Sequence, residues 1–125
     1  MSENDIAKIV VDSALQIYKV LGPGLLESVY EELLAHDLIK RGLEVERQKS
    51  FGILYDEVKL DIGFRADIVV NNKLIIEIKS VEEIAPVHYK QLLTYLRILD
   101  FRLGLLINFN VALIKNGIKR IANGF

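Results

Sequence analysis

Two apolar segments that are interrupted by charged residues constrain the fold of this chain more than any other feature. The first segment covers residues 64–70 and contains Asp67, and the second covers residues 74–80 and contains Glu77 and Lys79. Charged groups within strands this apolar are costly unless a partner compensates them. A metal ion bridged by the two carboxylates would do so, with the lysine directed at a phosphate or a water molecule.

The composition indicates a soluble, cytoplasmic protein. With 125 residues, 51% of them hydrophobic and 26% charged, the chain fits one domain over residues 1–125 with a buried core. The absence of cysteine excludes disulfides, thiolate zinc sites, iron–sulfur clusters and thiol nucleophiles. The acidic N-terminus has no signal-peptide pattern, and no apolar stretch is long enough to span a bilayer.

The charge balance gives no support to broad contact with phosphates. Sixteen Lys and Arg residues are offset by seventeen acids, and the basic residues are dispersed along the chain. Two local groups could still form a basic patch: Arg41, Arg47 and Lys49, and Lys115, Lys119 and Arg120.

Hydrophobic periodicity predicts three helices and a run of strands. The helices are expected over residues 2–21, 25–41 and 86–99, with breaks at the Gly22-Pro23-Gly24 turn and at Gly42. Strands are expected over residues 43–54, 57–62, 64–70, 74–80 and 103–109, followed by a ribbon over 111–121. This order predicts a single α/β domain in which helices flank a mixed central sheet.

The pairing of the two interrupted strands decides whether the carboxylates meet. Side chains alternate between the faces of a strand, so a shift of one residue separates Asp67 from Glu77. Pairing Val70 with Leu74 places the two acids opposite each other. It also stacks four apolar residues on one face, namely Ala66, Ile68, Ile76 and Ile78. We predict three loop residues, or two with a bulge, rather than a plain two-residue turn, because apolar matching and site chemistry both favour this pairing.

An acid–x–lysine triplet is weak evidence by itself. A second triplet, Glu57-Val58-Lys59, lies in a segment that we expect at a solvated edge of the sheet. Glu77-Ile78-Lys79 differs because isoleucines surround it and Asp67 lies on the neighbouring strand. These charges alone are equally compatible with a catalytic site and with a structural ion-pair network on a half-exposed sheet.

Two helices offer further polar groups. On the second helix, Glu27 is expected at the edge of the apolar stripe, with Glu31 and Glu32 further toward solvent. Taken alone, Glu27 is better explained as a helix-terminal acid that the helix dipole favours. The third helix carries three polar residues on one flank, where they would bind a phosphate or a nucleotide or satisfy the helix–sheet boundary: His88, Gln91 and Tyr95. For the histidine, a structural or substrate-side role is favoured over metal ligation.

The segment Gly24-Leu25-Leu26-Glu27-Ser28-Val29-Tyr30 resembles the G-x-x-E-x-x-Y signature of the small prokaryotic GxxExxY proteins. These proteins are similar to the PD-(D/E)xK nuclease superfamily. The resemblance covers nearly the whole chain and continues in order through Arg65-Ala66-Asp67, Glu77-Ile78-Lys79, Pro86-Val87-His88, Gln91 and Tyr95.

The resemblance implies a restriction-endonuclease-like PD-(D/E)xK core and a site for Mg²⁺ or Mn²⁺. Asp67 and Glu77 would be the metal ligands, and Lys79 would orient the attacking water or stabilise charge on the phosphate. Glu27 would be an additional ligand or base, as in the RecB-like branch. The substrate-positioning residues would be Gln91, Tyr95 and His88.

The expected activity is therefore phosphodiester hydrolysis in nucleic acid, with DNA favoured over RNA. Hard oxygen ligands suit Mg²⁺ or Mn²⁺, which activates water and neutralises charge. Because the domain is small, a homodimer or a partner protein is expected to supply specificity. Two other functions stay open: a catalytically inactive nucleic-acid- or protein-binding module on the nuclease fold, and an interaction protein whose apolar surface mediates assembly.

Overall fold

Three α-helices and a five-stranded sheet form the part of the chain that the structure, a computed structural model, describes. The described residues are 1–124, so Phe125, the last residue of the expected domain, lies outside them. The elements follow in the order α1 (Glu3–Leu21), α2 (Glu27–Lys40), β1 (Val45–Tyr55), β2 (Val58–Val70), β3 (Leu74–Lys79), α3 (Pro86–Leu99), β4 (Leu103–Asn108), the short 3₁₀ helix η1 (Ile114–Asn116) and β5 (Ile118–Ala122).

Local sequence signals fix the helix ends. The Ser2 hydroxyl accepts a hydrogen bond from the Asp5 N–H and the Asp5 carboxylate accepts one from the Ser2 N–H, each at 3.1 Å, which forms a capping box at the start of α1. Gly22 ends α1 with a φ of 69°, a conformation that glycine adopts without strain. Pro86 begins α3, where its fixed φ suits the first helical position.

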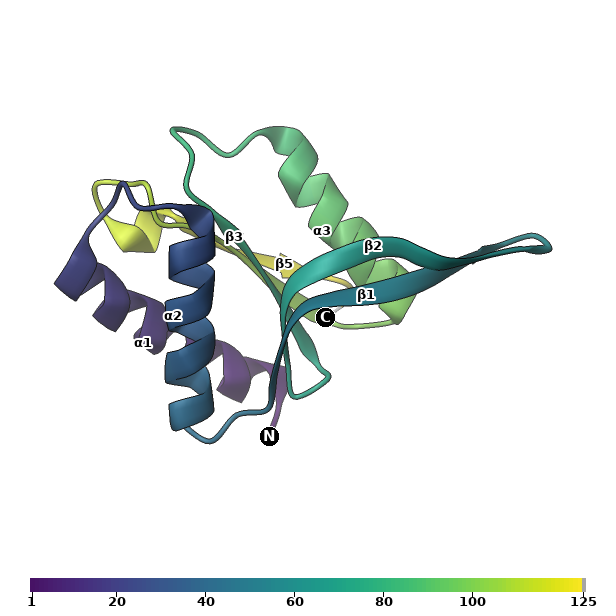
Figure 1. Cartoon of the computed structure of the whole chain (residues 1–125), viewed down its shortest axis with the longest axis horizontal. Helices are drawn as coiled ribbons and strands as arrows, with labels where there is room; N and C mark the ends of the chain where they lie inside the picture. Colours follow the sequence, from purple (N-terminus) through teal and green to yellow (C-terminus); the bar gives the residue numbers. More distant parts are fainter. Residues whose placement is uncertain (125) are drawn as a thin grey trace.

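The sheet is mixed, with its strands in the spatial order β1-β2-β3-β4-β5. β3 and β4 are parallel and α3 connects them, while the other neighbouring pairs are antiparallel. α1 and α2 cover one face of the sheet and α3 covers the other, so the domain has three layers (Figure 1). The predicted α/β architecture of a mixed sheet flanked by helices is confirmed.

The predicted register of the central hairpin is also confirmed. Val70 pairs with Leu74 across a three-residue connection, and Ile68 pairs with Ile76. Asn71 and Asn72 in the connection have φ values of 50° and 51°, in the left-handed region that asparagine tolerates better than most residues. The register therefore brings position 67 opposite position 77.

One predicted face is wrong. Ile68, Ile76 and Ile78 pack in the core under α1 and α2, but Ala66 packs in the core under α3. The reason lies in the neighbouring strand β1, where Gln48 has a φ of 48° in the middle of an otherwise extended segment. This irregularity stands opposite Asp67, so the alternation of side chains along β2 is interrupted there.

The strand boundaries differ from the prediction at two places. The prediction placed two strands on either side of Gly63, but β2 runs continuously through this residue. The pairing with β1 continues on both sides of it, with a register shift between Phe51 and Ile53. A Cβ on Gly63 would lie 2.2 Å from the Ile53 side chain, so only glycine fits beneath it. The expected ribbon over 111–121 is instead a loop, η1 and the strand β5.

The outer parts of β1 and β2 form a hairpin that extends beyond the sheet (Figure 1). β3 pairs with β2 only at residues 68–70, so the hairpin is a two-stranded ribbon at its far end. We call residues 52–63 the arm. As expected, Glu57-Val58-Lys59 is exposed, because it lies at the tip of the arm.

Candidate active site

Asp67 and Glu77 lie where β2 and β3 stop pairing. The last paired residues of the ladder are Ile68 and Ile76. Beyond them, backbone N–H groups donate to the two carboxylates instead of to carbonyls of the neighbouring strand. The Asp67 N–H donates to Glu77 Oε2 at 2.8 Å, and the Ile78 N–H donates to Asp67 Oδ2 at 2.8 Å. Each acid thus binds the other strand, and the two carboxylates are held side by side in the opening between the strands.

This arrangement makes ionisation costly. Glu77 is 6% exposed, and its burial, together with the negative charge of Asp67, raises its pKa to about 8. Burial is also the main reason that the pKa of Asp67 is raised, against the lowering effect of the hydrogen bond from Ile78. Two adjacent acids with raised pKa values mark this position as a candidate functional site.

Lys79 supplies positive charge next to the pair. It is the last residue of β3, on the same strand face as Glu77, and its ammonium lowers the pKa of both Asp67 and Glu77. Its backbone is fixed because its carbonyl accepts a hydrogen bond from the Phe109 N–H at 3.0 Å. The structure therefore brings three predicted residues, Asp67, Glu77 and Lys79, into one site.

A polar network that the sequence interpretation missed supports Asp67. The Gln48 side-chain amide donates to Glu31 Oε1 at 2.7 Å and to Asp67 Oδ1 at 3.3 Å. Arg47 donates to Glu31 Oε2 through Nε at 3.1 Å and through Nη2 at 2.9 Å. Glu31 also acts on the pair directly, since its negative charge raises the pKa of both Asp67 and Glu77.

Two of the three glutamates of α2 lie in environments opposite to those that we predicted. Glu31 is buried at 6% exposure, although we expected it toward solvent, while Glu27 is exposed at the first turn of the helix. Helical spacing contained the signal, because Glu31 precedes the buried Leu34 and Leu38 by three and seven residues. Its burial is tolerated because Arg47 and Gln48 satisfy its carboxylate.

Glu27 belongs to a neighbouring polar hollow at the end of β3. Its carboxylate accepts a hydrogen bond from the Ser80 N–H at 3.3 Å, and the Ser80 hydroxyl donates to the Leu25 carbonyl at 2.7 Å. The hollow measures about 510 Å³ and is lined by Gly24, Leu25, Leu26, Glu27, Ser28, Ser80 and Asn110. It adjoins the site, because Ser80 follows Lys79 directly in the chain.

Tyr30 explains why the G-x-x-E-x-x-Y segment has a tyrosine at its end. Its ring stacks on Phe109 with centroids 4.3 Å apart, in the core under α1 and α2. Its hydroxyl donates to the Gly22 carbonyl at 2.6 Å and accepts from the Leu25 N–H at 3.1 Å. The tyrosine therefore fixes the turn before α2, and with it the position of Glu27.

The three residues predicted on α3 lie at different depths. Tyr95 stacks on Phe64 with centroids 4.2 Å apart, and burial together with the charges of Glu77 and Asp67 raises its pKa. Gln91 is exposed and His88 is half-buried.

The donor set at the pair fits a hard divalent cation. Mg²⁺ is commonly held by one or two carboxylates together with water and substrate phosphates, and Asp67 and Glu77 supply such carboxylates. Within residues 1–124, no group of three or more His, Cys, Asp or Glu side chains is arranged to hold a metal ion. The additional role of Glu27 as a ligand accordingly stays a prediction.

Comparison with known proteins agrees with this geometry. A family model for the PD-(D/E)XK nuclease superfamily matches residues 4–121, so the chain belongs to this superfamily. Its members are generally nucleases that act on nucleic acid with divalent metals such as Mg²⁺ or Mn²⁺. No curated protein and no solved structure gives a significant match. Within residues 1–124, no helix is long and apolar enough to cross a membrane.

Proposed function

We propose that this chain is a divalent-metal-dependent nuclease that hydrolyses phosphodiester bonds, with DNA as the favoured substrate over RNA. The observation that carries the proposal is the pair of carboxylates, the half-buried Asp67 and the buried Glu77, in the opening between β2 and β3 with Lys79 beside them. Membership of the nuclease superfamily supports the same activity.

In this proposal, Asp67 and Glu77 hold Mg²⁺ or Mn²⁺. Such an ion lowers the pKa of a bound water and offsets the negative charge that develops on the phosphate. Lys79 orients the attacking water or stabilises the phosphate charge through its ammonium. Gln48 holds Asp67 Oδ1 in place, so that the carboxylate does not have to reorganise when it binds a cation.

The remaining predicted residues surround this pair. Glu27 acts as an additional ligand or base from the hollow beside Ser80, and Tyr95, Gln91 and His88 position the substrate from α3. We further propose that the chain is a cytoplasmic member of the GxxExxY proteins and of the RecB-like branch. The G-x-x-E-x-x-Y segment and the Gln91 and Tyr95 spacing support that placement.

Metal binding is the first test, because it requires no knowledge of the substrate. Calorimetry with Mn²⁺ is expected to give binding for the wild-type chain and for Glu32→Ala, an exposed glutamate on α2 that serves as the matched control. Binding should disappear in Glu77→Ala. Circular dichroism of the three proteins checks that each variant folds.

Turnover is the second test, on duplex and single-stranded DNA and on RNA with Mg²⁺ or Mn²⁺. Cleavage by the wild type that is lost in Glu77→Ala and in Asp67→Ala supports the nuclease. Cleavage that both variants retain contradicts the site. Metal and nucleic-acid binding without turnover would favour the alternative, an inactive binding module on the nuclease fold.

A further inference from the structure

The arm exposes more apolar surface than a solvated hairpin needs. Leu54, Tyr55, Val58 and Leu60 are 72%, 79%, 57% and 53% exposed. Tyr55 pairs with Val58 and Ile53 pairs with Leu60 across the ribbon, so Tyr55, Val58 and Leu60 share one face with Ile53, while Leu54 pairs with Lys59 on the other face. Contiguous exposed apolar side chains at the end of a projecting element are typical of an interaction surface.

The charges of the arm argue against nucleic acid as its partner. Asp56, Glu57 and Asp61 lie at or near its turn and are all exposed, and Lys59 offsets only one of them. A phosphate backbone would be repelled by this net negative charge. Two arms packed against each other would face the same repulsion, so the arm fits a surface that combines apolar and basic groups.

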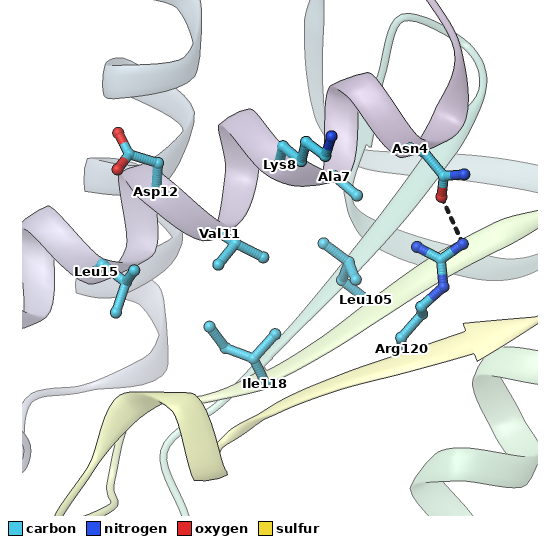
Figure 2. Close-up of a pocket in the computed structure, with 9 residues that line it drawn as sticks. All are labelled: Asn4, Ala7, Lys8, Val11, Asp12, Leu15, Leu105, Ile118 and Arg120. Atoms are coloured by element: carbon cyan, nitrogen blue, oxygen red, sulfur yellow. Dashed lines mark hydrogen bonds between the residues drawn. The ribbon is translucent and has the colours of Figure 1, made fainter.

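Such a surface exists between α1 and the strands β4 and β5. An apolar groove of about 560 Å³ lies there, and its floor and walls are formed by Ala7, Val11, Leu15, Leu105 and Ile118 (Figure 2). Lys8 and Arg120 stand at its rim, the latter bound to Asn4 at 2.5 Å. Asp12 also lines the groove, but its carboxylate is paired with Arg41 at 2.6 Å.

The arm and the groove cannot meet within one chain. The arm continues β1 and β2 at one end of the strand order, and the groove borders β5 at the other end. The arm also extends away from α1 (Figure 1). Filling the groove with an arm therefore requires a second molecule.

We propose that two copies of this chain associate by exchanging arms, with the apolar face of each arm seated in the groove of the other copy. Tyr55, Val58 and Leu60 would cover Val11, Leu15 and Ile118. The acidic turn around Glu57 would meet Lys8 and Arg120 at the rim. Reciprocal exchange makes two identical contacts about a two-fold axis, so the assembly closes as a dimer.

Charge reversal tests the pairing of arm and groove. The wild-type mass, measured by sedimentation equilibrium over a range of concentrations, is expected to be that of a dimer. Glu57→Lys and Lys8→Glu should each weaken the dimer about 10-fold or more, because each places like charges together. The double variant Glu57→Lys/Lys8→Glu should recover most of the affinity. Both positions are exposed, so neither change threatens the fold.

Cysteine cross-linking gives an independent test, because the chain contains no cysteine. After mild oxidation, an equimolar mixture of Tyr55→Cys and Val11→Cys is expected to give a disulfide-linked dimer containing one chain of each kind. Each variant alone should stay uncross-linked. Efficient cross-linking of Tyr55→Cys alone would show arm–arm contact and overturn the proposal.

Three other outcomes would also overturn it. These are a wild-type chain that stays monomeric at high concentration, single reversals that leave the dimer unchanged, and a double variant that is no better than the single ones. A gain in DNA affinity in Glu57→Lys without any change of mass would assign the arm to substrate instead, because the added positive charge would attract the phosphate backbone. None of these measurements depends on nuclease activity.

Discussion

The chain contains the same acid–x–lysine pattern twice, and the two copies have opposite environments. Glu57-Val58-Lys59 lies at the tip of the arm, exposed to solvent, whereas Glu77 is buried at the end of the β2–β3 ladder. The pKa of Glu77 is raised by burial and by Asp67. The acid–x–lysine pattern alone therefore does not indicate a functional site. The buried position of Glu77 and the nearby Asp67 perturb the pKa of this acid and make the second copy a candidate.

The strand β2 connects these two environments. Its inner half carries Asp67 between the two cores, and its outer half begins at Val58 in the arm. The same strand thus holds a catalytic candidate in its inner half and, in its outer half, the apolar surface that is proposed to bind a second copy. Paired substitutions at equivalent positions of the two triplets can therefore separate the effect of the motif from the effect of its surroundings.

The largest contrast is expected for the two lysines. Lys79→Met should reduce the rate of phosphodiester cleavage by about 100-fold or more, since it removes the charge that is proposed to act on the reacting phosphate in a partly buried site. Lys59→Met should leave the rate within about two-fold, because a lone exposed charge contributes little. Single-turnover kinetics at saturating metal give the comparison. Equal losses in both variants would contradict the assignment of Lys79.

A smaller effect is expected when Asp67 loses its support. Gln48→Leu removes the amide that bridges Glu31 and Asp67, and we expect Mn²⁺ affinity to fall about 10-fold to 100-fold. Gln16→Leu, at an exposed position of α1, is the matched control. Calorimetry of both variants gives the Mn²⁺ affinities. An affinity for Gln48→Leu equal to that of the wild type would show that the Gln48 hydrogen bonds have only a structural role.

The smallest effect concerns stability without metal. Folding raises the pKa of Glu77 from 4.5 to about 8. Between these two values, the folded chain therefore keeps a proton that the unfolded chain has lost. The free energy of unfolding should therefore fall as pH rises from about 5 to about 8. Glu77→Gln should remove much of this fall and raise the Tm at pH 8 by about 5 °C.

The control for this measurement is Glu57→Gln, at the exposed triplet, whose stability should follow pH as the wild type does. Calorimetric unfolding in the presence of a chelator gives the Tm of each protein at pH 5 and at pH 8. Each variant is then compared with the wild type at each pH. Wild type and Glu77→Gln with the same pH dependence would show that the buried carboxyl does not titrate as described.

Much of the site followed from patterns of alternation. The choice between a two-residue and a three-residue connection determined whether Asp67 met Glu77, and apolar matching of Val70 with Leu74 gave the register that the structure has. The reason is that burying one face of a hairpin penalises every register but one. The helices could also be predicted from the sequence. Their apolar periodicity begins or ends at Ser2, Gly22 and Pro86, which are residue types that favour helix ends.

What the sequence did not reveal depends on contacts between distant segments. Glu31 is buried because Arg47 and Gln48 reach it from β1, and nothing local to α2 announces those partners. Ala66 changes face because of the backbone conformation of Gln48 in the neighbouring strand. The helical spacing of Glu31 was visible, but a charged residue on an apolar face was read as solvent-facing.

The hydrogen bonds that end the β2–β3 ladder allow metal binding at this site to be detected through the protein backbone. The amide protons of Asp67 and Ile78 point at the carboxylates that are proposed to bind metal. A cation bound at either carboxylate draws electron density from it and so changes the environment of these two protons, which NMR spectroscopy of the backbone records directly. Occupancy can thus be followed residue by residue with no substrate present, because the sheet and the site share the same two bonds.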